Sequence, residues 1–83
     1  MAKVEVYSSA LCPYCMMAKK LLNRKGIEYT EIRVDADPAK RQEMMVKSQQ
    51  RTVPQIFIND EAIGGYTDLL ALDKSQQLAS MLA

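Results

Sequence analysis

Three stretches of the chain alternate between apolar and polar side chains, and this alternation predicts β-strands. They are residues 3–7, 27–34 and 54–58, and each is rich in β-branched or aromatic residues. Asn59 and Asp60 follow the third stretch as a tight turn, so residues 61–63 are expected to form a short fourth strand in a hairpin. The pattern therefore predicts four strands.

The segment from Pro13 to Gly26 has apolar side chains at helical spacing. Pro13 suits the first position of a helix, because its missing N–H would have no intrahelical partner there. Gly26 suits the residue that follows a helix. The side chains expected to face the core are those of Cys15, Ala18, Leu21 and Leu22.

Further helices are predicted after the second strand and after the hairpin. Asp37 is expected to be an N-cap with Pro38 at the first helical position, and this helix runs to about residue 48. Thr67 is expected to cap a helix through about residue 72, and a last short helix is expected to begin at Ser75. Its inward-facing side chains would be Leu78, Met81 and Leu82.

The order of elements is therefore β-α-β-α-β-β-α, which is typical of an α/β fold. A strand–helix–strand unit requires a parallel pair of strands joined by a right-handed crossover, and the later hairpin must be antiparallel. We expect one domain over residues 1–83, with a mixed four-stranded sheet and helices on both faces.

Charge and hydropathy exclude several classes of protein. Eleven Lys and Arg nearly balance ten Asp and Glu, so no basic face for nucleic acid is expected. No run of 18 apolar residues predicts a membrane span, and the first residues lack the apolar core of a signal peptide. These features predict a cytoplasmic protein, in a reducing compartment where paired cysteines are more often catalytic than structural.

Cys12 and Cys15 are the only cysteines, and the chain has no histidine. A structural zinc site needs four such ligands, so no metal site within one chain is expected. The pair is therefore either a redox centre or an accident of packing. Two thiols three positions apart, at the junction of a strand and a helix, favour the redox centre.

The predicted helix start assigns different roles to the two sulfurs. Partial positive charge at a helix N-terminus stabilises a thiolate, so the pKa of Cys12 should fall below the free value of about 8.5. Cys12 is then expected to attack a substrate disulfide. Cys15, nearly one turn later and more enclosed, is expected to resolve the mixed disulfide.

Three motifs together resemble the glutaredoxins, of the short bacterial type with two active-site cysteines. They are Cys-Pro-Tyr-Cys at 12–15, Thr-Val-Pro at 52–54 and Gly-Gly-Tyr-Thr-Asp at 64–68, which matches the Gly-Gly-x-x-Asp motif of the family. The motifs occur in family order, and the element order fits along essentially the whole chain. The resemblance implies a thioredoxin-like fold, glutathione as co-substrate and no tightly bound cofactor.

The resemblance also implies a glutathione site. Pro54 would follow a cis peptide bond, which leaves the backbone of Val53 free to pair with the extended glutathione backbone. Thr52 belongs to the same segment. From these residues alone, an ordinary trans proline opening an edge strand would be the favoured interpretation.

The two ends of glutathione would be held elsewhere. N–H groups at Thr67 and Asp68 suit the γ-glutamyl carboxylate, and the Asp68 side chain could accept from the ammonium group. Tyr14 is expected to pack along the peptide, and Arg41 to pair with the glycine carboxylate. Plain helix capping by Asp68 and a solvated helix face at Arg41 remain alternatives.

The chain departs from the family pattern at two places. Many glutaredoxins have a lysine three residues before the first cysteine, where this chain has Ser9. A nearby cation would lower the pKa of the thiol, so the helix N-terminus is expected to supply most of the activation here. Met16 and Met17 stand where polar residues are common, either as core filling or as a soft contact surface beside the thiol.

The function expected is a glutathione-dependent thiol–disulfide oxidoreductase, acting as a monomer on disulfide-containing or glutathionylated proteins. Ribonucleotide reductase is a substrate expected at the level of the family only. One alternative is a thioredoxin-like reductant served by a reductase protein. Others are a dimer holding a glutathione-ligated [2Fe–2S] cluster through Cys12 and a zinc clamp between two chains.

Overall fold

The computed structural model describes residues 2–82 as eight elements. The strands are β1 (Val4–Ser8), β2 (Thr30–Arg33), β3 (Gln55–Ile58) and β4 (Glu61–Gly64). The helices are α1 (Pro13–Arg24), α2 (Pro38–Ser48), α3 (Tyr66–Lys74) and α4 (Gln77–Leu82). None of these helices has both the length and the apolar character needed to cross a bilayer.

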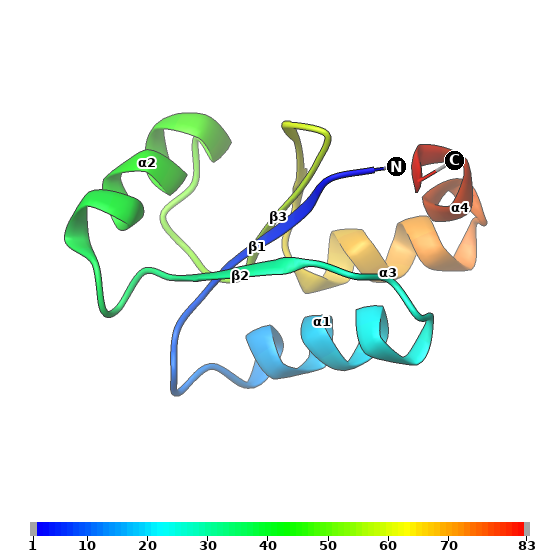
Figure 1. Ribbon diagram of the computed structural model, residues 1–83, viewed down its shortest axis with the longest axis horizontal. Coiled ribbons are helices and arrows are strands. Elements are labelled where there is room, and N and C mark those ends of the chain that lie inside the picture. Colours follow the sequence, from blue (N-terminus) through cyan, green and yellow to red (C-terminus); the bar gives the residue numbers. More distant parts are fainter. Residues whose placement is uncertain (1, 83) are drawn as a thin grey trace.

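The four strands form one mixed sheet in the order β2-β1-β3-β4. β1 pairs in parallel with β2, whereas β3 runs antiparallel to both β1 and β4. α1 connects the two parallel strands across one face of the sheet (Figure 1). The predicted thioredoxin-like architecture is confirmed.

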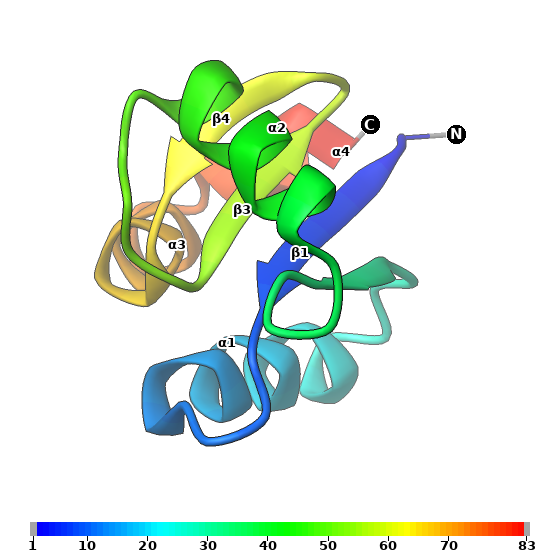
Figure 2. The same ribbon diagram turned by 90° about the vertical axis from the view of Figure 1, so that its left-hand side faces the viewer.

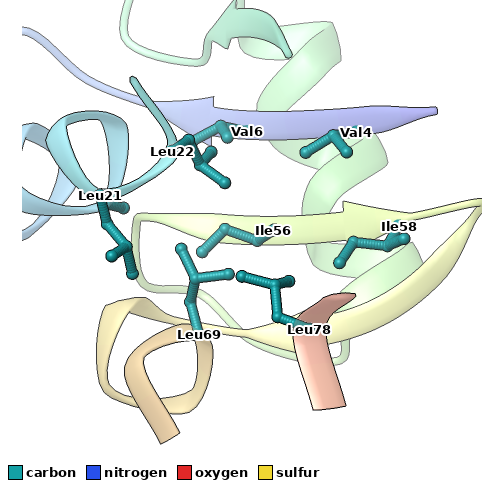
Figure 3. Packing of buried hydrophobic residues seen from close by; sticks show 9 residues of the cluster. Val4, Val6, Leu21, Leu22, Ile56, Ile58, Leu69 and Leu78 are labelled. Atoms are coloured by element: carbon teal, nitrogen blue, oxygen red, sulfur yellow. The ribbon is translucent and has the colours of Figure 1, made fainter. Parts of the chain in front are cut away.

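Helices cover both faces of the sheet, as expected. α1, α3 and α4 lie on one side and α2 on the other (Figures 1 and 2). Because successive side chains of β1 point to opposite faces of the sheet, Val4 and Val6 pack on the first side and Tyr7 packs on the second. Figure 3 shows the larger core on the first side, where the labelled valines of β1 and isoleucines of β3 meet leucines from the three helices.

The second strand is shorter than predicted, because the chain after α1 first completes the end of that helix. Gly26 has a φ of +70°, and the N–H of Ile27 donates to the carbonyl of Leu22 at 2.9 Å. This arrangement satisfies a carbonyl that the helix leaves unpaired. Ile27 and Tyr29 still pack against the core, but pairing with β1 begins only at Thr30.

The predictions at the ends of the last two helices are wrong by two residues. Gly65, not Thr67, is the N-cap of α3, which continues to Lys74. Ser75 ends α3 instead of beginning the last helix, and Gln76 has a φ of 66°. A left-handed residue interrupts helical geometry, so α4 begins at Gln77. Asp37 is the N-cap of α2 as predicted, accepting from the N–H of Ala39 at 3.0 Å.

Truncation of Leu22 should destabilise the protein strongly, because its side chain is fully buried between α1 and the sheet (Figure 3). Leu22→Ala is expected to lower the free energy of unfolding by about 2–5 kcal/mol, measured by urea denaturation. Val46→Ala is the matched control, since Val46 is 60% exposed; it should change stability by less than about 0.5 kcal/mol. Equal effects of the two substitutions would show that the core is placed wrongly.

Candidate active site

The cysteine pair sits where the chain leaves β1 and enters α1. Cys12 is the N-cap of α1, with extended backbone angles, and its Sγ accepts the N–H of Cys15 at 3.1 Å. The two residues form a disulfide, with their Cα atoms 5.2 Å apart. Cys15 is fully buried and Cys12 is 9% exposed, so Cys12 is the less enclosed of the two residues.

The helix start favours the thiolate form of Cys12 once the disulfide is reduced. An N-cap side chain receives N–H groups that have no partner within the helix, and the helix dipole adds positive potential there. Both effects would stabilise negative charge on a sulfur at this position.

A second wall of the site is the segment before β3. The peptide bond between Val53 and Pro54 is cis, and the carbonyl oxygen of Val53 lies 3.7 Å from the Cys12 sulfur. Gln55 is buried, and its Nε2 donates to the carbonyl of Thr52 at 3.0 Å. Gln55 therefore holds the bend in place beside the sulfur.

The third wall is the beginning of α3. The Asp68 carboxylate accepts from the N–H of Gly65 at 3.0 Å, so Asp68 does act as a helix cap. Gly64 has a φ of +116°, and a Cβ at this position would overlap the Asp68 carboxylate. Thr67 follows one residue after the helix start, where N–H groups point out of the helix without intrahelical partners.

The start of α1, the segment before β3 and the start of α3 line a groove of about 330 Å³, and neither Cys12 nor Asp68 is among its lining residues. Tyr14 and Tyr66 stack along one side of it, with ring centroids 6.3 Å apart and an angle of 20° between the planes. Its lining residues are Tyr14, Thr52, Val53, Pro54, Gly65, Tyr66 and Thr67. Five of the residues predicted to bind glutathione therefore line one groove, although they come from three separate parts of the chain.

Arg41 does not line the groove. It lies on α2, where its Nη2 donates to the carbonyl of Arg51 at 3.2 Å. Arg51 directly precedes Thr52, so the guanidinium is attached to the loop that forms one end of the groove. The hydrogen bond occupies one donor of the guanidinium, which has five in all.

The turn that precedes Cys12 is held by two carboxylates, one within β2 and one just after it. Asp35 accepts from the N–H of Ala10 at 3.1 Å and forms a bidentate pair with Arg33, at 2.9 and 2.7 Å. Glu31 accepts from the Ser8 hydroxyl at 2.6 Å and from Lys19 of α1 at 2.8 Å. These contacts fix both ends of the turn that contains Ser9.

The same contacts shift the acid–base equilibria of both carboxyl groups. The Arg33 guanidinium and the Ala10 N–H hold the pKa of Asp35 well below its usual range. Hydrogen bonds from Lys19 and Ser8 lower the pKa of Glu31. Both groups are therefore ionised at neutral pH, and the turn stays clamped.

Comparison with known proteins identifies the family of this chain. The glutaredoxin family model matches residues 4–63. The chain belongs to the glutaredoxin family. It is 49% identical over 82 residues to glutaredoxin 3 of Escherichia coli K12, covering 99% of each chain. It is 43% identical over 83 residues to a glutaredoxin of Pseudomonas aeruginosa, covering 100% of this chain and 99% of that one.

Solved glutaredoxin structures share the fold. A solution structure from Brucella melitensis has a TM-score of 0.87 and 46% identity, covering 99% of this chain and 89% of that one. A crystal structure of a buckwheat glutaredoxin–glutathione complex has a TM-score of 0.89 and 31% identity, covering 98% and 76%. The Cys12–Cys15 pair and the similarity to these relatives show that this glutaredoxin is a thiol–disulfide oxidoreductase.

Sequence reasoning missed several residues that shape the site of this glutaredoxin. Tyr66 lies inside the motif at 64–68, but the motif alone indicates no role for it. Its stacking on Tyr14 can be recognised only once the fold brings the two rings together. Gly65 and Asp68 are three positions apart, a spacing typical of helix capping, and this signal would have placed the helix start correctly. Nothing in the local pattern of residues 31–35 indicated that Glu31 and Asp35 reach back to the active-site turn.

The Glu31 contacts predict a specific dependence of stability on pH. A carboxyl group whose folded pKa is lowered stabilises the protein above its unfolded pKa of about 4.3, and this stability is lost as the pH falls through the folded pKa. Wild type should therefore exceed Glu31→Gln in unfolding free energy at pH 7, and the difference should shrink below about pH 4. Urea denaturation at a series of pH values from 7 to below 4 measures this difference in unfolding free energy.

Glu28→Gln serves as the matched control for Glu31→Gln. Glu28 is exposed and forms no ion pair within residues 2–82, so its substitution should leave the pH profile of stability unchanged. A difference between wild type and Glu31→Gln that stayed constant down to pH 3 would contradict the role assigned to Glu31.

Proposed function

We propose that this glutaredoxin reduces protein disulfides and protein–glutathione mixed disulfides, with glutathione as its reductant. The observation that carries the proposal is a groove next to the Cys12 sulfur. Val53 and the first turn of α3 line this groove, and the Cys12 sulfur, at a helix start, lies 3.7 Å from the Val53 carbonyl oxygen. A sulfur next to a peptide-sized groove suits a thiol-containing tripeptide.

The centre of glutathione would pair with the backbone of Val53. Within residues 2–82, Val53 takes part in no backbone–backbone hydrogen bond outside regular elements, and its carbonyl lies next to the Cys12 sulfur. An extended peptide can add to such a free segment as a strand adds to a sheet edge. This placement would bring the cysteinyl sulfur of glutathione to Cys12.

The ends of glutathione carry charges, which groups near the groove would bind. The γ-glutamyl carboxylate would accept from N–H groups at Thr67 and Asp68 at the start of α3. One oxygen of Asp68 caps the helix, and its second oxygen would accept from the ammonium group. Arg41, attached to the loop before Thr52, would pair with the glycine carboxylate.

Reduction of a protein disulfide would use both cysteines. The Cys12 thiolate attacks one sulfur, and the other leaves as a thiolate that takes up a proton. The Cys15 thiolate then attacks the Cys12 sulfur, releasing the second substrate thiol and forming the Cys12–Cys15 disulfide. One glutathione thiolate opens this disulfide to a mixed disulfide on Cys12, and a second removes the first as oxidised glutathione.

Reduction of a glutathionylated protein would need Cys12 alone. Its thiolate attacks the glutathione sulfur, the protein thiol leaves, and a second glutathione regenerates Cys12 as oxidised glutathione departs. The difference in burial supports this division of roles. Cys12 is 9% exposed, whereas Cys15 is fully buried and can reach Cys12 as an internal nucleophile.

The compartment, the domain organisation, the oligomeric state and the substrates are also proposed. A pair of cysteines that closes a loop of this size staples an unfolded chain only weakly, which supports a redox role in the reducing cytoplasm. We propose a single domain that works as a monomer on disulfide-containing or glutathionylated proteins, ribonucleotide reductase among them. Glutathione would be a co-substrate and no cofactor would be bound tightly.

Substitution of the two cysteines should separate the two activities. Cys15→Ser is expected to retain reduction of a glutathionylated peptide and to lose most reduction of a protein disulfide, because the internal nucleophile is missing. Cys12→Ser should lose both. The measurement is the glutathione-coupled assay with glutathione reductase and NADPH, run on both substrates. Retention of protein-disulfide reduction by Cys15→Ser, or loss of both activities, would contradict the assigned roles.

A further inference from the structure

The exposed face of α1 beside Cys12 is not used by the glutathione groove. We propose that this face binds the polypeptide part of the substrate. It favours polypeptides whose reactive cysteine has a large apolar neighbour and acidic residues about four to six positions away. The inference rests on the proposed function, since the substrate must be attacked at Cys12. It adds the chemical class of the preferred polypeptide.

The part of this face nearest the disulfide is apolar. Leu11, which directly precedes Cys12, is 98% exposed, and Met16 and Met17 in the first turns of α1 are 52% and 44% exposed. We call these three residues the apolar rim. Large apolar side chains with this much exposure, all within five positions of a reactive cysteine, favour contact with an apolar partner. Methionine side chains adapt to partners of different shape.

Beyond the apolar rim the face becomes basic. α1 contains no acidic residue, and Lys20 and Arg24 follow the rim at helical spacing, four positions apart. Within residues 2–82, Lys19 forms an ion pair with Glu31 at 2.8 Å, whereas no ion pair involves Lys20 or Arg24. Two uncompensated cations on one exposed face attract an acidic partner.

Helix geometry sets the spacing that the partner needs. A rise of about 1.5 Å per residue places Lys20 about 12 Å and Arg24 about 18 Å along the axis from Cys12. An extended peptide covers about 3.3 Å per residue. Acidic side chains about four and about six positions from the reactive cysteine would therefore lie opposite Lys20 and Arg24.

A glutathionylated substrate makes this face the natural place for its polypeptide. The disulfide joins two chains, and the groove between Tyr14, Val53 and Thr67 takes the glutathione. Tyr14 closes that side by stacking on Tyr66. On the side of α1 that faces away from the sheet, Figures 1 and 2 show no other described element, so a peptide can leave Cys12 along the helix.

The test uses glutathionylated decapeptides with leucine next to the cysteine. In the first pair, one peptide carries glutamates at the positions four and six residues after the cysteine, and the other carries glutamines there. The second pair differs in the same way at the positions four and six residues before the cysteine. The mixed disulfide of glutathione and 2-mercaptoethanol is the small reference substrate. In each case the Cys12 thiolate attacks the glutathione sulfur, and the peptide thiol, or 2-mercaptoethanol, leaves and is protonated. The readout is kcat/KM in the glutathione-coupled assay.

Wild type should prefer the glutamate peptide over its glutamine partner by about five- to tenfold in at least one chain direction, from two exposed ion pairs. About 0.5 M sodium chloride should largely abolish the preference. The double variant Lys20→Glu/Arg24→Glu should reverse it while leaving the small substrate unaffected. Lys74→Glu is the matched control, because this exposed lysine lies at the far end of α3, and it should retain the preference.

The apolar rim is tested separately by Met16→Ser/Met17→Ser. This variant should lower kcat/KM severalfold for peptides with leucine beside the cysteine, and much less for peptides with serine there. Equal rates for glutamate and glutamine peptides in wild type, or a preference that survives the Lys20→Glu/Arg24→Glu change, would overturn the proposal. Failure to turn over the small mixed disulfide would instead overturn the proposed function on which it rests.

Discussion

The contact on which the site depends is the hydrogen bond from the Cys15 N–H to the Cys12 sulfur at the first turn of α1. This bond makes a cysteine the cap of a helix, so one interaction both ends the loop after β1 and stabilises negative charge on the sulfur. Because α1 then runs back along the sheet and buries Cys15, the same turn separates a slightly exposed cysteine from a fully buried one. The proposed activation of Cys12 and the proposed order of attack both depend on where this helix begins.

Sheet topology supplies the rest of the site. β1 and β3 are adjacent and antiparallel, with Tyr7 opposite Gln55, so the end of β1 that leads to Cys12 meets the start of β3 that follows Pro54. The hairpin of β3 and β4 then returns the chain to the same edge, where α3 begins. Three segments far apart in sequence thus meet at one edge, although each separately is an ordinary loop or helix start.

Most of the fold was predictable because its signals are local. Alternating side chains in β1 and β3, Pro13 and Pro38 at helix starts and Gly26 after α1 each specify an element without reference to the rest. Boundaries were wrong where a hydrogen bond at a helix end decided them: the N–H of Ile27 donates back to the carbonyl of Leu22, and Gly65 rather than Thr67 is the cap of α3. The roles of Tyr66, Glu31 and Asp35 depend on contacts between elements, and no local pattern encodes those contacts.

Glutathione bound to Cys12 is proposed to lie between the Val53 backbone and the start of α3. The direct measurement is an NMR study of Cys15→Ser carrying glutathione as a mixed disulfide on Cys12. Intermolecular NOEs are expected from the cysteinyl part of glutathione to Val53, and from the γ-glutamyl part to Thr67 and Asp68. NOEs that place the tripeptide along Met16 and Lys20 of α1 instead would contradict this placement.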